Sequence, residues 1–255
     1  MHEKDLTKKQ FGENAQSYVT SSTHSKKEDL NALVALLKPQ KDMVALDIAT
    51  GGGHTAKYLA AKVKRIIATD LTKEMLAAAK DHLKHIDNIV FAEADAEQLP
   101  YPDNHVDIVT CRIAAHHFPS PQKFVAEARR VLKKNGKFLL VDNVASEYAT
   151  FDFFINKMEK MRDPSHVRSL NISEWEALFE NNGLQLLYEQ KRKKNLPYQE
   201  WVSRMMSSQE DIQNVTNFIL QSPQEIQNYY QIVYDTSGDI VSFSLDEWVA
   251  VCKKT

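Results

Sequence analysis

Short apolar runs alternate with amphipathic stretches of helical spacing through the first 145 residues. The runs lie at 44–49, 65–70, 89–93, 106–111 and 137–141, and the helices are expected at 54–63, 72–83 and 121–132. Strands that are apolar along their whole length are covered on both faces, and strand–helix alternation gives a parallel sheet. The sequence therefore predicts an α/β fold of the Rossmann-like, doubly wound type, with a mostly parallel sheet.

The last third of the chain has a different pattern. A helix is expected from Glu174 to a glycine stop at Gly183, with a strand at 184–188 and helical stretches around 197–206 and 208–232. The apolar segment 240–251 fits a strand or a short helix, and a strand is favoured for its first half. These elements are expected to end the sheet and to add helical cap elements.

Composition narrows the class of protein. With 43% hydrophobic and 26% charged residues, the chain can bury an ordinary core, and a net charge of -2 gives no global reason to expect nucleic acid or an anionic membrane. Two cysteines cannot form a disulfide framework or a four-thiolate zinc site, and no metal site is expected. The polar N-terminal segment lacks the apolar run of a signal peptide, and no stretch reaches the ~18 apolar residues of a membrane span. We expect a cytoplasmic protein without membrane insertion.

Three consecutive glycines, Gly51 to Gly53, follow the first apolar run, although the chain has only seven glycines in all. Glycine is needed where a Cβ would block a tight turn between strand and helix, and such a turn lets a ligand approach main-chain atoms at a helix N-terminus. Ligands of open α/β sheets bind at the carboxyl ends of the strands. A ligand site at this turn is favoured over a turn without function.

The glycine pattern alone leaves the ligand open. Gly51-x-Gly53-x-x-Ala56 satisfies the dinucleotide fingerprint, and Asp70 ends the second apolar run about 20 residues later, where a carboxylate can accept hydrogen bonds from ribose hydroxyls. NAD and S-adenosylmethionine both contain that ribose. Asp70 therefore does not separate the two.

Two acidic residues do separate them. Asp47 lies four residues before Gly51, where a carboxylate would repel the pyrophosphate of NAD but suits the ammonium and sulfonium of S-adenosylmethionine. Asp95 follows the third apolar run, where its carboxylate can accept from an adenine amino group while the next backbone N–H donates to the ring. Both positions favour S-adenosylmethionine.

Four segments between residues 43 and 142 occur in the order and spacing of one family: LDIATGGGHTA, IIATDLTKEML, FAEADAEQLPYPDNHVDIVTCRIAAHHF and EARRVLKKNGKFLLVD. They resemble the class I S-adenosylmethionine-dependent methyltransferases of the small-molecule type, which include the ubiquinone and menaquinone C-methyltransferases. The stretch from Met161 to Arg168 is similar to a group of uncharacterised bacterial relatives. The chain departs from the family at Ala49, where glycine is usual, and at Thr50, where cysteine is frequent.

The resemblance implies a division of the chain and a role for each matching position. Residues 1–40 would close over the site, 41–145 would bind the cofactor, and 146–255 would end the sheet and surround the acceptor, all within one domain. Asp47 would anchor the methionine end of the cofactor, Asp70 would take the ribose hydroxyls, and Asp95 with the N–H of Ala96 would hold the adenine edge. The other implied contacts are the backbone of Ala49, Thr50, Gly51 and Gly53, the adenine neighbours Leu71 and Met75, Arg112 near the methionine carboxylate, and Tyr18 and His24 over the site.

Methyl transfer requires alignment of the acceptor atom, and a general base where the acceptor must lose a proton. The candidates are His116, His117, Asp142, Arg162, His166 and Arg168, of which His117, His166 and Arg168 are preferred. The competing interpretations are buried structural histidines and arginines in surface salt bridges. The small acceptor, the atom that receives the methyl group and the oligomeric state are left open.

Other functions are weighed against this one. The basic run Lys191–Lys194 could touch RNA, but a solvated loop at the end of a strand is favoured. A nicotinamide-dependent oxidoreductase would also use Gly51, Gly53 and Asp70, yet the chain has no Tyr-x-x-x-Lys pair of the short-chain dehydrogenase type. A non-catalytic protein that binds S-adenosylmethionine is the third alternative.

Overall fold

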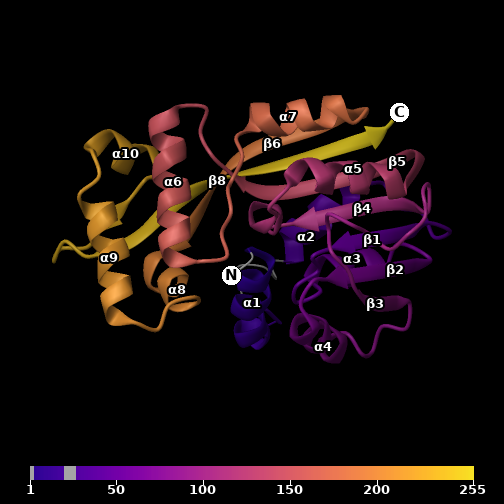
Figure 1. Ribbon diagram of the computed structural model, residues 1–255, viewed down its shortest axis with the longest axis horizontal. Coiled ribbons are helices and arrows are strands. Elements are labelled where there is room, and N and C mark those ends of the chain that lie inside the picture. The colour runs from indigo at the N-terminus through magenta and orange to yellow at the C-terminus, as the bar shows by residue number, and fades with distance from the viewer. Residues whose placement is uncertain (1–2, 20–26) are drawn as a thin grey trace.

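The computed structural model describes residues 3–19 and 27–255, and the side chains of residues 16–19 and 27 are not described. The described strands form one sheet in the order β3-β2-β1-β4-β5-β8-β6, with β7 beside β8 (Figure 1). The strands are β1 (Val44–Ile48), β2 (Arg65–Asp70), β3 (Ile89–Glu93), β4 (Val106–Arg112), β5 (Leu132–Val144), β6 (Leu184–Pro197), β7 (Val233–Tyr234) and β8 (Ile240–Lys254). Strands β1 to β5 pair in parallel, and β8 is antiparallel to both β5 and β6. The predicted mostly parallel α/β sheet is confirmed.

Helices cover both faces of this sheet. They are α1 (Glu3–Val19), α2 (Lys27–Leu36), α3 (His54–Ala60), α4 (Lys73–His82), η1 (Ala115–His117), α5 (Pro121–Val131), α6 (Ala149–Arg162), α7 (Ile172–Asn181), α8 (Tyr198–Ser203), α9 (Gln209–Leu220) and α10 (Gln224–Tyr229). Strand side chains alternate between faces: in β1, Ala45 joins the core beneath α2 and α3, whereas Leu46 and Ile48 join the core beneath α5 and α7. The fold is therefore doubly wound.

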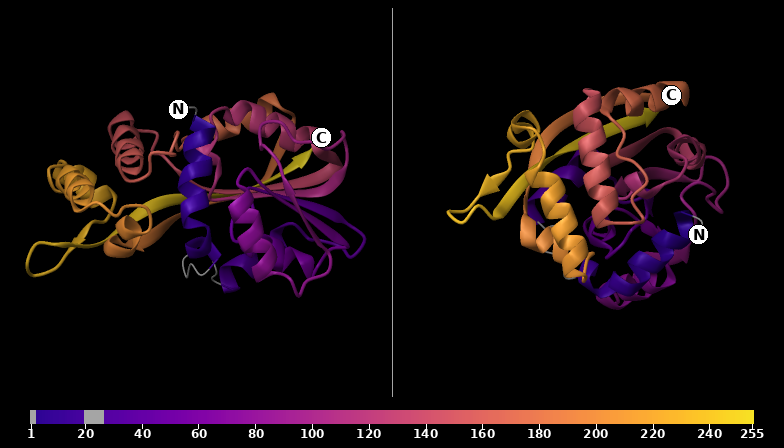
Figure 2. Two further views of the ribbon diagram at one scale, coloured as in Figure 1. Left: turned by 60° about the horizontal axis from the view of Figure 1, so that its bottom comes forward. Right: turned by 60° about the vertical axis from the view of Figure 1, so that its left-hand side comes forward.

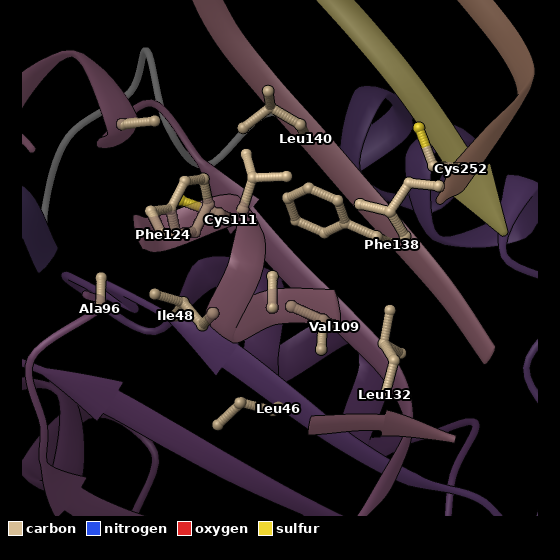
Figure 3. Packing of buried hydrophobic residues seen from close by; sticks show 14 of the residues in the cluster. Leu46, Ile48, Ala96, Val109, Cys111, Phe124, Leu132, Phe138, Leu140 and Cys252 are labelled. Carbon is tan, nitrogen blue, oxygen red and sulfur yellow. The ribbon is translucent and has the colours of Figure 1, made fainter. Parts of the chain in front are cut away.

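The core beneath α5 and α7 is rich in aromatic rings. Phe124 of α5 and Phe138 of β5 are fully buried, and their ring centroids lie 5.8 Å apart in an edge-to-face arrangement (Figure 3). Phe138 also meets Phe179 of α7 edge to face at 5.9 Å. This packing holds β4 and β5 in place, and their carboxyl ends carry the histidine pair and Asp142.

A third apolar core lies away from the main sheet, where α6, α8, α9 and α10 pack against the extended parts of β6 and β8. Phe154 of α6, Trp201 of α8 and Phe243 of β8 belong to it. Helix α1 lies between this cap and the main sheet (Figure 2), packs against α4 and donates a hydrogen bond from Gln10 to the carbonyl of Met205 in the cap. The chain thus has a cap joined to the core through two long strands.

The last third differs from the sequence-based expectations in three places. The expected strand 184–188 extends to Pro197, and the segment 240–251 is strand throughout rather than strand in its first half or a short helix. The expected helix 208–232 ends at Leu220, and α10 starts after Pro223, because proline cannot donate the backbone hydrogen bond that a continuous helix needs.

The basic run 191–194 is not a solvated loop, which corrects the sequence-based interpretation. It lies in β6 opposite Asp246 and Glu247 of β8, whose side chains are 2% exposed. Lys194 pairs with Glu247 at 3.0 Å and Lys193 with Asp246 at 3.1 Å. The partners lie about fifty residues further along the chain, so no local pattern could have identified them.

Candidate functional site

The turn between β1 and α3 places main-chain atoms at the carboxyl edge of the sheet. Ala49, Gly51 and Gly53 all have positive φ values, of 51°, 54° and 79°. The left-handed region costs a non-glycine residue about 1–2 kcal/mol. The family's usual glycine at position 49 therefore has a conformational reason, and Ala49 is a strained residue at the site.

Gly53 is required for packing as well as for its backbone angle. A Cβ added there would lie 2.6 Å from Cδ1 of the buried Leu83, whereas one added at Gly238, where φ is 87°, would meet nothing within 4 Å. We expect Gly53→Ala to lower the free energy of unfolding by about 2–4 kcal/mol, combining the left-handed penalty and overpacking. Gly238→Ala should cost only the left-handed penalty. Urea unfolding compares the two variants, and equal losses would show that the Leu83 contact has no effect.

Asp47 is a buried carboxylate fixed by two hydroxyls. Thr50 donates to Oδ2 at 2.7 Å and Thr110 to Oδ1 at 2.5 Å. Asp47 is only 2% exposed. Burial raises the pKa of Asp47 to about 6, although both hydroxyls and the positive charge of Arg112 act in the opposite direction. A bound cation would return this carboxyl group fully to its charged form.

Asp70 has the geometry expected for a ribose ligand. Its Oδ2 accepts from the backbone N–H of Gly51 at 3.0 Å, and its Oδ1 from that of Thr72 at 3.0 Å. Each carboxylate oxygen has further lone-pair capacity, so two adjacent hydroxyls can donate to it. Burial raises the pKa of Asp70, with the backbone hydrogen bonds opposing the rise.

Asp95 is held in a loop after β3 and is connected to α1. Its Oδ1 accepts from the N–H of Glu97 at 2.9 Å, while Nζ of Lys4 lies 2.6 Å from Oδ2 and 2.6 Å from Oε2 of Glu97. Sequence reasoning missed Lys4, because it lies 91 residues from Asp95 in a polar helix that contains no recognisable motif. Lys4 of α1 thus lies beside the two carboxylates that follow β3 and lines the same cavity.

Asp47, Asp70 and Asp95 line one cavity, the first cavity, whose space between the lining atoms is about 1000 Å³ when the part open to solvent is included. The predicted cofactor residues that line it are Asp47, Ala49, Thr50, Gly51, Asp70, Leu71, Met75, Asp95, Ala96 and Arg112. Gly53 does not line the cavity, but its positive φ shapes the turn whose neighbouring residues do. Tyr18 lies in α1, but its side chain is not described, and His24 lies outside the described residues.

The first cavity fits an adenosyl ligand with an amino-acid tail. Nε of Arg112 is buried and has no hydrogen-bond partner among the described residues, so a carboxylate would satisfy it. Asp47, which interacts electrostatically with Arg112, offers the opposite charge, and Asp70 and Asp95 also line the cavity. The donor set matches a ligand that carries both an ammonium and a carboxylate.

A second cavity lies beside the first, and the space between its lining atoms is about 510 Å³ when the part open to solvent is included. Phe11, Ile113 and His117 line both cavities. The second cavity is completed by His116 of η1 and Asn143 of β5, and by a larger set from the cap. The residues of that set are Glu159, Arg162, Lys194, Leu196, Trp201, Arg204 and Leu245.

The predicted catalytic residues do not all meet at these cavities. His117 lines both, whereas His166 and Arg168 line neither. Arg168 pairs with Asp152 at 2.8 Å and with Glu174 at 3.0 Å, and Nε2 of His166 lies 3.0 Å from Oδ1 of Asn156. His116 and Arg162, which the sequence named as further candidates, both line the second cavity.

The described residues include no group of three or more His, Cys, Asp or Glu side chains that could hold a metal ion. Among the helices of residues 3–19 and 27–255, none is both long and apolar enough to span a bilayer. Cys111 and Cys252 are free and buried.

Comparison with known proteins agrees with the fold. Residues 46–140 match a family described as a methyltransferase domain. The chain is 37% identical to the uncharacterised methyltransferase YcgJ of Bacillus subtilis over 239 residues, 92% of this chain and 94% of YcgJ. The crystal structure of YcgJ superposes with a TM-score of 0.86 over 89% of this chain and 98% of that one.

Two further similarities point the same way. A Bacillus halodurans protein described as a methyltransferase is 39% identical, with a TM-score of 0.86 over 89% of this chain and 99% of that one. The ubiquinone/menaquinone C-methyltransferase UbiE of Rickettsia akari is 36% identical over 113 residues, 41% of this chain and 46% of UbiE. The chain belongs to the class I S-adenosylmethionine-dependent methyltransferases. It is a methyltransferase, and S-adenosylmethionine is its cofactor.

Proposed function

We propose that this methyltransferase acts on a small molecule bound in the second cavity. The observation that carries the proposal is the shared wall of the two cavities, formed by Phe11, Ile113 and His117. A methyl donor in the first cavity would thus stand next to an acceptor in the second. The main requirement of the reaction is that the acceptor atom be aligned with the methyl group.

The donor would be held by residues of the first cavity. Asp70 would accept from the ribose hydroxyls, Asp95 from the adenine amino group, and Arg112 would meet the methionine carboxylate. When bound, S-adenosylmethionine supplies a methyl group on a positively charged sulfur, which needs no further activation. The protein's own residues must position the acceptor, exclude water and receive a proton.

The lining of the second cavity supports a small acceptor rather than a macromolecule. Leu196, Trp201 and Leu245 line it from the cap, and they stand among a few polar side chains that could orient a small molecule. The basic run 191–194, which could have suggested RNA, is paired with carboxylates of β8.

The free thiols of Cys111 and Cys252 support a reducing compartment such as the cytoplasm.

Narrowing the second cavity tests this proposal. Leu196 is 6% exposed and lines the cavity, whereas Leu220 is 41% exposed on α9. We expect Leu196→Trp to reduce transfer of a tritiated methyl group to a panel of phenols and quinols by about tenfold or more, since overpacking costs about 1–3 kcal/mol. Affinity for S-adenosylmethionine, measured by calorimetry, should change less than twofold.

Leu220→Trp is the matched control and should leave both quantities unchanged. Circular dichroism and thermal unfolding check that each variant is folded. Unchanged transfer in a folded Leu196→Trp variant would place the acceptor elsewhere.

A further inference from the structure

We propose that His116, oriented by Asp142, is the general base that deprotonates the acceptor, and that the acceptor is a weak O–H acid of the phenol or enol type. This inference rests on the proposed function, because it takes the second cavity as the acceptor site. Sequence reasoning named His116 and Asp142 as separate candidates. The structure joins them in one unit.

Asp142 holds His116 by two hydrogen bonds. Its Oδ2 accepts from the backbone N–H of His116 at 2.9 Å, and its Oδ1 lies 2.6 Å from Nδ1 of the ring. Asp142 is 2% exposed. An ionised carboxylate can only accept, so Nδ1 carries a proton and Nε2 of the neutral ring is left as a proton acceptor.

Nε2 of His116 is available for an acceptor molecule. It has no hydrogen-bond partner within the described part of the chain, and His116 lines the second cavity. Burial of the ring opposes its charged form, but the charge of Asp142 and its hydrogen bond outweigh burial and raise the pKa of His116. A proton taken from the acceptor would therefore be retained on this ring.

The neighbouring histidines are poorer bases. His117 is engaged through Nδ1 with the carbonyl of Ser165 at 3.1 Å, and burial together with the charge of His116 lowers its pKa. His166 is engaged through Nε2 with Asn156, and burial lowers its pKa strongly. Among the three rings, His116 alone combines a carboxylate within hydrogen-bond distance and a position on the second cavity.

The same cavity provides groups that suit the anion formed by deprotonation. Arg162 lies over the ring of Trp201 at 4.8 Å, and its buried Nε is 3.2 Å from Glu159 but forms no hydrogen bond with any described residue. Oδ1 of Asn143 is also buried without a hydrogen-bond partner among the described residues. A hydroxylated acceptor could satisfy both, with its oxyanion toward Arg162 and a second hydroxyl donating to Asn143.

The proposed step balances in protons and electrons. The acceptor O–H bond breaks, its proton moves to Nε2 of His116, and the electron pair stays on oxygen. That pair then forms the new bond to the methyl carbon, while the pair of the broken carbon–sulfur bond stays on sulfur. Release of the proton from His116 to water restores the base.

The step predicts how activity depends on pH. The groups around His116 are Asp142 on β5, His117 on the same turn, Glu159 and Arg162 on α6, and Asp163 and His166 after α6. Lys194 on β6 and Arg204 after α8 line the same cavity. Below its raised pKa, His116 is protonated and cannot act as a base. Transfer should therefore rise with pH through that pKa and then level off. Asp142→Asn removes the charge that raises the pKa of His116, so the rise in transfer should occur at lower pH in that variant.

The direct test measures ionisation rather than turnover. A panel of nitrophenols is titrated into the enzyme saturated with S-adenosylhomocysteine, and absorbance reports the phenolate. We expect wild-type protein to bind the probe as phenolate at a pH where the free probe is neutral. His116→Gln should return ionisation to that of the free probe and lower kcat by about 10²–10⁴-fold, with calorimetric affinity for S-adenosylhomocysteine changed less than twofold.

His105→Gln, on an exposed histidine, is the matched control and should behave as wild type. Binding of every nitrophenol in neutral form, or no binding at all, would overturn the assignment of a weak O–H acid. Unchanged phenolate binding in His116→Gln would overturn the assignment of the base. Unchanged probe binding in Leu196→Trp would instead overturn the assignment of the second cavity as the acceptor site. Failure of the proposed function can therefore be told apart from failure of the proposed base.

Discussion

Asp70→Ala is expected to weaken binding of S-adenosylmethionine by at least about 100-fold. Hydrogen bonds to a charged group contribute about 1.5–3 kcal/mol each, and the carboxylate of Asp70 can accept two from ribose, so a loss of about 3–6 kcal/mol follows. The substitution also removes the acceptor for the backbone N–H groups of Gly51 and Thr72, which shape the turn. Isothermal titration calorimetry measures the change directly.

The control for this prediction is Asp81→Ala, at a side chain that is 80% exposed on α4. It should bind S-adenosylmethionine as the wild type does. Asp70→Asn retains the size of the side chain, and its affinity for S-adenosylmethionine should lie between those of Asp70→Ala and Asp81→Ala. Wild-type affinity in a folded Asp70→Ala variant would show that the ribose is held elsewhere.

Phe138→Ala is expected to have the largest effect on stability, about 3–5 kcal/mol. The ring is fully buried beside Phe124 (Figure 3) and also packs against Phe179. Its removal should leave a cavity between β5 and the helices α5 and α7. Urea unfolding monitored by circular dichroism gives the change. Phe153, which is 67% exposed on α6, provides the control, and Phe153→Ala should stay within about 0.5 kcal/mol of wild type.

A loss below about 1 kcal/mol in Phe138→Ala would mean that the surrounding rings collapse into the space. The aromatic core would then contribute little to holding β5, and the position of Asp142 would have to depend on β8 instead.

The first five strands could be predicted because their local pattern is unambiguous. β1 and β2 are short apolar runs, and burial on both faces requires that composition. β5 was expected only at 137–141, but it begins at Leu132, because Lys133 to Gly136 give no apolar signal. The convergence of Asp47, Asp70 and Asp95 could also be predicted, since the carboxyl ends of parallel strands meet at one edge.

The cap could not be predicted equally well, because its strands depend on partners distant in sequence. Strand β6 carries four basic residues in succession, and only the buried carboxylates of β8 make a strand possible there. Pairing of His116 with Asp142 and of Lys4 with Asp95 likewise joins residues 26 and 91 positions apart. Local periodicity carries no information about such pairs.

The proposed function depends most directly on which kind of molecule receives the methyl group. Purified enzyme is incubated with S-adenosylmethionine carrying a tritiated methyl group and a bacterial cell extract, and the products are divided by ultrafiltration into small molecules and macromolecules. We predict enzyme-dependent label in the small-molecule fraction, lost in the Leu196→Trp variant. Label confined to protein or nucleic acid would contradict the assignment of the second cavity to a small acceptor.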